Sequence, residues 1–113
     1  MRTLHMLHSL DIAVMDYGTT VRKGSKWEDL APNEQFELCV CTRNPETHDV
    51  KGIGRAVALW YGQFREIPAR MLVNEHEIAS RDYWGLFDSM RRAYGDDFNE
   101  ADAVTVIEYQ RMS

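Results

Sequence analysis

The sequence lacks any long hydrophobic run. No apolar stretch approaches the roughly 20 residues that a helix needs to cross a bilayer. Residues 1–8 are too short and too often interrupted by polar side chains to act as a signal peptide. We therefore expect a soluble protein of the cytoplasm with no membrane partner. Internal repeats, low-complexity tracts and linkers are also missing, so the 113 residues predict a single domain, 1–113, with one hydrophobic core.

Cysteine is scarce as well, with Cys39 and Cys41 as the two examples in the chain. On a strand their side chains would share a face, but partners this close rarely reach disulfide geometry. We expect two free thiols, which are typical of a reducing cytosol. The thiols could in principle ligate zinc together with His5, His8 or His48, although the spacing leaves those other ligands unspecified.

Common catalytic motifs are missing too. The sequence has no Gly-rich phosphate loop, no nucleophile elbow and no Ser/His/Asp arrangement. The stretch Glu75-His76-Glu77 carries one His, whereas a metalloprotease helix needs two His residues at i and i+4. We accordingly predict no metal site and no cofactor.

Positive charge is in short supply, with 13 Lys and Arg against 18 Asp and Glu and a formal net charge of −5. Non-specific binding to nucleic acid depends on phosphate neutralisation by Lys and Arg. The composition therefore argues against a general nucleic-acid coat protein, but it is compatible with a local basic pocket. An acidic surface would also suit a protein partner.

Alternating apolar and polar residues predict several short strands. They fall at residues 3–8, 36–41, 50–61 and 103–111. Mostly antiparallel strands with segregated helices make an α+β fold. A small, strongly curved β-barrel with flanking helices would bury strands of this length best.

The clearest helix covers residues 82–94. Its apolar stripe has the helical period, Ser80 is the expected N-cap, and Gly95 closes the helix. The stripe consists of Tyr83, Leu86, Phe87, Met90 and Tyr94. Weaker patterns predict short helices over 10–17 and 68–75. The polar, basic residues from Gly18 to Asp29 are expected to form a loop or an irregular extended segment.

Several segments match the pattern of a known protein family. Its signature reads Gly, any residue, Lys, two residues, Glu or Thr, any residue, Arg, and Thr20 and Arg22 match the last two named positions. Further similar segments are Leu30–Leu38, Gly52–Ala56, His76-Glu77, Ser80-Arg81 and Tyr94-Gly95-Asp96. By their order and spacing the chain resembles an ASCH domain of the PUA-like β-barrel superfamily. The resemblance implies one ASCH-like domain with a PUA-like barrel.

One part of the signature differs in this sequence. The family Gly falls on Met15 and the family Lys falls on Tyr17. In members that hydrolyse N4-acylated cytidine, this Lys is part of the catalytic machinery. The replacement at Tyr17 therefore makes amidohydrolase activity doubtful.

The basic stretch from Thr20 to Lys26 is the first candidate site. Arg22, Lys23 and Lys26 supply donors for phosphate or carboxylate groups, and Thr20 supplies a hydroxyl. The alternative is a solvated loop with no specific role. Trp60 is a candidate for stacking on a base, against the alternative that it packs in the core.

A second candidate site lies before the long helix and consists of His76, Glu77 and Asp82. A His and a carboxylate can transfer protons, and a helix N-terminus offers N–H groups to a ligand. The alternative is that Asp82 only caps the helix, while His76 packs against the protein or is solvated.

These residues support three hypotheses. The first is a binding module for RNA or a nucleotide-like ligand, in a cleft between the basic loop 20–26 and the helix 82–94. The second is a hydrolase of a modified nucleoside, of the N4-acylcytidine type, or of RNA. Its catalytic residues would be Thr20, Glu77 and Asp82, with Lys23 or Lys26 replacing the missing Lys. The third is a protein-interaction domain with an acidic surface and a vestigial pocket.

Overall fold

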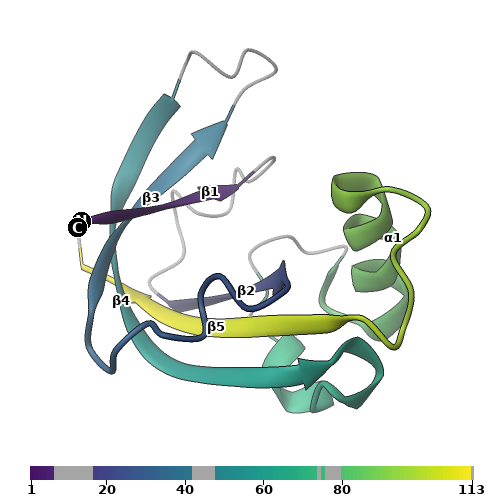
Figure 1. The fold of residues 1–113 in the computed structure, drawn as a ribbon. Coiled ribbons are helices and arrows are strands. Elements are labelled where there is room, and N and C mark those ends of the chain that lie inside the picture. Colours follow the sequence, from purple (N-terminus) through teal and green to yellow (C-terminus); the bar gives the residue numbers. More distant parts are fainter. Residues whose placement is uncertain (7–16, 42–47, 74, 76–79, 113) are drawn as a thin grey trace.

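The computed structural model describes residues 1–6, 17–41, 48–73, 75 and 80–112 (Figure 1). Most of these residues lie in strands, and one α-helix accompanies them. The strands are β1 (Arg2–Met6), β2 (Tyr17–Lys23), β3 (Gln35–Cys41), β4 (His48–Gln63) and β5 (Ala103–Arg111). Two 3-10 turns, η2 (Phe64–Glu66) and η3 (Ala69–Leu72), and the helix α1 (Tyr83–Tyr94) lie between β4 and β5. Among the described helices, none is long and apolar enough to span a membrane.

The five strands form one mixed sheet in the order β1-β3-β4-β5-β2. β1 runs parallel to β3, and the other neighbours are antiparallel. β4 is long enough to pair with β3 along residues 48–55 and with β5 along residues 54–63. Figure 1 shows β4 bending between these two partners. Within the described part of the chain, β1 and β2 are the two edges of the sheet and do not pair with each other. The predicted barrel is therefore not confirmed, and the sheet is open.

Several predicted elements are confirmed. β5 has the predicted bounds, β3 begins one residue before the predicted strand, and the predicted strand 50–61 lies within β4. Of the predicted strand 3–8, residues 3–6 lie in β1, whereas residues 7 and 8 lie outside the described residues.

For Gly18 to Asp29 the prediction was a loop or an irregular extended segment, and the first half is instead a regular paired strand. Residues 17–23 form β2, which pairs with β5 from Tyr17 opposite Gln110 to Lys23 opposite Val104. The hydropathy pattern missed this strand because two of its buried residues, Thr19 and Thr20, are polar. Their β-branched shape favours a strand nonetheless. Tyr17 therefore belongs to a strand and not to a first helix, whose other predicted residues, 10–16, lie outside the described part of the chain.

The predicted helix 68–75 is also reduced, to the 3-10 turn η3. α1 agrees with the prediction, but its N-cap is Asp82, whose side chain accepts a hydrogen bond of 2.8 Å from the N–H of Gly85. Ser80 was the wrong cap, because its hydroxyl instead hydrogen-bonds with that of Ser89 at 2.7 Å. At the other end Gly95 adopts a φ of 102°, a left-handed value that favours glycine.

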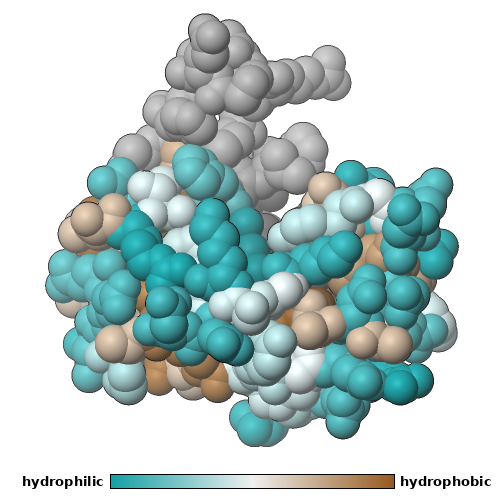
Figure 2. Space-filling view, viewed as in Figure 1, coloured by the Kyte–Doolittle hydropathy of each residue, from teal (hydrophilic) through white to brown (hydrophobic). Residues whose placement is uncertain are grey.

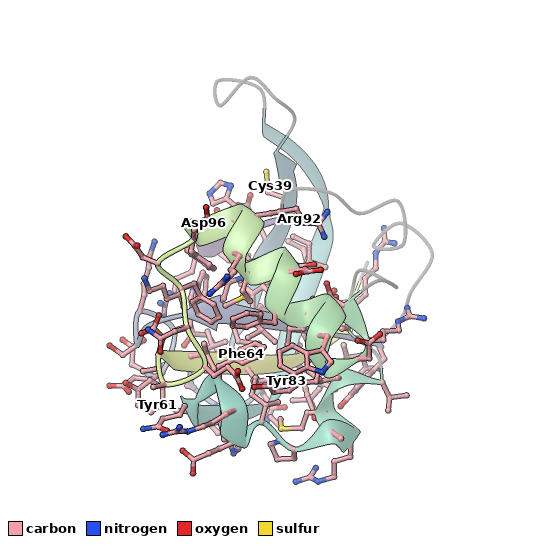
Figure 3. All side chains as sticks on the ribbon, turned by 90° about the vertical axis from the view of Figure 1, so that its right-hand side faces the viewer. Cys39, Tyr61, Phe64, Tyr83, Arg92 and Asp96 are labelled. Carbon is pink, nitrogen blue, oxygen red and sulfur yellow. The ribbon has the colours of Figure 1, made fainter. Side chains whose placement is uncertain are left out.

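Two apolar clusters lie on opposite faces of the sheet. β5 contributes to both, because alternate residues of a strand point to opposite faces. The first cluster contains Leu4, Trp27, Leu30, Phe36, Leu38, Ala56, Ile107 and Tyr109. The second packs beneath α1 and contains Val21, Phe64, Met71, Leu72, Leu86, Met90, Phe98, Val104 and Val106. In Figure 3, Phe64 and Tyr83 lie close together at the first turn of α1, and their ring centroids are 5.1 Å apart.

Candidate functional site

Thr20 and Arg22 are neighbours on one face of β2, since residues two apart on a strand point the same way. Thr20 is 1% exposed, and its Oγ1 atom has no hydrogen-bond partner among the described residues. The Nε atom of Arg22 is also buried without a described partner, while the residue as a whole is half-buried. Buried polar atoms are rarely left unpaired, because each costs about 1–3 kcal/mol. Two of them side by side therefore mark this face of β2 as a candidate binding site.

The surroundings of Arg22 come from three other segments. Burial lowers the pKa of the Arg22 guanidinium, while Tyr94, Glu75 and Tyr109 act in the opposite direction. Arg22 remains a cation at neutral pH, since the ordinary pKa of arginine is so high. Tyr94 lies in the last turn of α1, where its hydroxyl hydrogen-bonds the Arg22 side chain and accepts from the backbone N–H of Lys23 at 3.3 Å. α1 and β2 therefore meet at Arg22.

Glu75 places a carboxylate in the same surroundings. It is 2% exposed and forms an isolated parallel bridge with Thr19, so its backbone lies along the outer edge of β2. Sequence reasoning chose Glu77, two residues further on, because the pair His76-Glu77 resembles the family and lies before the long helix. The bridge to β2, which decides that Glu75 is buried, has no signal in the sequence.

Tyr109 completes the site from β5. Burial and then the nearby Glu75 raise the pKa of its phenol, and Arg22 acts against them. Its ring lies directly against Gly18, where a Cβ atom would come within 2.5 Å of the Tyr109 hydroxyl oxygen. Glycine at position 18 therefore lets the phenol lie on β2. We call Thr20, Arg22, Glu75, Tyr94 and Tyr109 together the Arg22 site.

Comparison with known proteins identifies the fold. No family model matches the sequence, and no curated protein matches it. Among solved structures, the crystal structure of an ASCH domain from Lactobacillus crispatus JV V101 is similar over 85% of the chain, with a TM-score of 0.52. The fold is ASCH-like. The two chains are 11% identical, so the likeness concerns the fold alone, and the present chain covers 64% of that protein's chain.

In this ASCH-like fold, two of the predicted cations lie apart from Arg22. Lys23 follows Arg22 on β2, so its side chain points to the opposite face, and it is exposed. Lys26 is exposed in the turn that follows, where its carbonyl accepts a hydrogen bond of 2.6 Å from Arg2. Roles for Lys23 and Lys26 in binding stay predictions.

Trp60 also lies away from the Arg22 site. It pairs with Val106, whereas Arg22 pairs with the adjacent Thr105, so the two side chains point to opposite faces of the sheet. Trp60 packs against the apolar cluster beneath α1. Its ring crowds Gly62, where a Cβ atom would approach to 2.8 Å. Core packing therefore accounts for Trp60, and base stacking by it stays a prediction.

The second predicted site is described at one residue. Asp82 is exposed and caps α1, whereas His76 and Glu77 lie outside the described residues. Across the described ranges, no three side chains of His, Cys, Asp or Glu come together to hold a metal ion.

In Figure 1, β2 runs between the β1–β3 part of the sheet and α1, and Figure 2 shows hydrophilic side chains across the centre of this view.

Proposed function

We propose that this ASCH-like domain binds RNA or a nucleotide-like ligand at the Arg22 site, where β2 meets α1. The observation that supports it most is the pair of buried polar atoms, Thr20 Oγ1 and Arg22 Nε, for which the described residues supply no partner. A ligand that reaches these atoms would satisfy a donor and a hydroxyl whose burial otherwise costs free energy.

The charges of the site favour a neutral, planar polar group. Arg22 is a cation and Glu75 carries a carboxylate, so the two charges largely offset each other. A phosphate placed beside Glu75 would be repelled, since like charges in a poorly solvated site interact strongly. The hydrogen-bonding edge of a nucleobase carries acceptors for Arg22 and donors for a carboxylate. The base would therefore enter the site, and its phosphates would stay near the surface.

The test is a titration of the protein with the four ribonucleoside 5′-monophosphates and a ten-nucleotide single-stranded RNA, monitored by calorimetry. Arg22→Gln should weaken binding roughly 10- to 150-fold, because hydrogen bonds to charged groups contribute about 1.5–3 kcal/mol. Thr20→Val should weaken it less, by roughly 2- to 10-fold. Arg70→Gln is the matched control, since Arg70 is an exposed arginine of η3. Equal affinity in wild type and Arg22→Gln would overturn the proposal.

A hydrolase remains the second candidate, because the Thr20 hydroxyl and the Glu75 carboxylate are buried next to the same strand. Tyr17, which stands where the family has its Lys, does not supply the same chemistry. The Tyr17 hydroxyl donates to Glu108 at 3.0 Å, and burial followed by Glu108 raises the pKa of the phenol. A phenol with a raised pKa is a poorer base at neutral pH. Chromatographic assay with N4-acetylcytidine decides between the candidates, since turnover that disappears in Thr20→Val or Glu75→Gln would establish the enzyme.

A further inference from the structure

The backbone of Glu75 is held by the segment that leads into α1. The Nε atom of Arg81 donates a hydrogen bond of 3.0 Å to the Glu75 carbonyl oxygen. The Glu75 N–H donates to the carbonyl of Leu72 at 3.1 Å, and Thr19 of β2 bridges to the same residue. Glu75 is thus fixed from three directions, and Arg81 is the one side chain among these contacts.

Arg81 is itself fixed to the helix. Ser80, the residue before it, is 1% exposed and hydrogen-bonds with Ser89 of α1 at 2.7 Å. Asp82, the residue after it, caps α1 through Gly85. Because both neighbours are anchored, the Arg81 side chain reaches Glu75 from a rigid base. A guanidinium donates in fixed directions, and its bond to a carbonyl is charge-assisted.

The geometry points to Arg81 as a positioning residue of the Arg22 site, which acts by holding the Glu75 carbonyl so that the buried Glu75 carboxylate stays beside Arg22. This inference rests on the proposed function in one respect, because Arg22 and Glu75 need to be held side by side only if both contact the same ligand. Glu75 influences both Arg22 and Tyr109 electrostatically. Loss of the Arg81 bond would therefore change the site without removing any group that contacts the ligand.

The first test does not depend on a ligand. The buried Nε–H of Arg22 should give a slowly exchanging signal in 1H–15N NMR spectra, and its position reports on the nearby carboxylate. We expect Arg81→Met and Glu75→Gln each to shift this signal, and the double variant to shift it no further than Glu75→Gln alone. Arg81→Lys, which keeps a charged donor, should restore most of the wild-type position. Arg70→Met is the control at an exposed arginine and should leave the signal unchanged.

A purely structural role for Arg81 predicts a different pattern. Arg81→Met would then lower the melting temperature while the Arg22 signal kept its wild-type position, or the shifts of the two single variants would add. Either result overturns the inference. If Arg81→Met does not fold, Arg81→Gln takes its place, because the amide keeps a donor with a shorter reach.

Binding provides the second test, with whichever nucleotide or RNA probe binds the wild type. Arg81→Met should weaken its affinity several-fold in the wild-type background and leave it unchanged in the Glu75→Gln background. An equal loss in both backgrounds would refute action through Glu75. If no probe binds but the NMR pattern is as expected, the proposed function fails while the positioning role of Arg81 stands.

Discussion

Replacing Gly18 with alanine tests how tightly the Arg22 site is packed. The added Cβ would come within 2.5 Å of the Tyr109 hydroxyl oxygen, 2.6 Å of Cζ and 3.2 Å of Cε1. Tyr109 cannot swing away cheaply, because it is 2% exposed and packs edge-on against Phe36, with ring centroids 6.0 Å apart. Forcing extra atoms into a filled core costs about 1–3 kcal/mol. We therefore expect Gly18→Ala to lower the free energy of unfolding by about 2 kcal/mol.

Urea titration followed by circular dichroism measures this loss. The matched background is Tyr109→Leu, which removes the end of the ring that the new methyl group would meet. Gly18→Ala should cost less there, and the difference between the two backgrounds gives the coupling energy of the pair. A loss below about 0.5 kcal/mol in the wild-type background, with no coupling to Tyr109, would refute the packing argument.

Three further predictions concern α1. Leu86→Ala should cost about 2–5 kcal/mol in urea titration, because Leu86 is 2% exposed under the helix, and a loss below about 0.5 kcal/mol would contradict its burial. Asp82→Ala should cost about 0.5–2 kcal/mol in the same assay, because it removes the N-cap, while Asp82→Asn should retain most of the stability. Burial and then a hydrogen bond to Glu100 raise the pKa of Tyr83 to about 12. The folded state thus holds this proton more tightly than the unfolded state, so the stabilisation is complete below the ordinary pKa near 10 and is lost as pH rises towards 12. Melting temperatures between these pH values should fall less steeply in Tyr83→Phe, and an identical slope would contradict this prediction.

The parts of the fold that were predictable have a strong hydrophobic period. Alternate residues of β5 pack in two apolar clusters, and the stripe of α1 packs on one of them. The buried positions of these elements are apolar, so the sequence shows the period of a strand or a helix there. β2 has a buried face too, but Thr20 and Arg22 are polar, and a hydropathy pattern interprets such residues as solvent-exposed. The strand that carries the site was therefore the strand that periodicity missed, because the site needs polar groups where a core would need apolar ones.

The candidate site was predictable in part. Thr20 and Arg22 were named from the family resemblance, and both lie on one face of β2. Their neighbours Glu75, Tyr94 and Tyr109 come from segments far apart in the sequence, and tertiary contacts bring them to Arg22. The apolar period of α1 assigned Tyr94 to the stripe that packs on the sheet, whereas its hydroxyl reaches β2 at the last turn. A stripe predicts which face of a helix is covered, but it does not say which partner each residue meets.

The position of β5 between β4 and β2 has a consequence for synthesis of the chain. In the described sheet, the strand partner of β2 is β5, and the bond between Tyr17 and Glu108 spans 91 residues of sequence. As the chain leaves the ribosome, β2 emerges long before the strand that pairs with it, and pairings over such distances form late. The Arg22 site therefore cannot exist on a nascent or truncated chain that ends before residue 103. A ligand that binds at the Arg22 site would therefore stabilise chains that include β5 without engaging shorter ones.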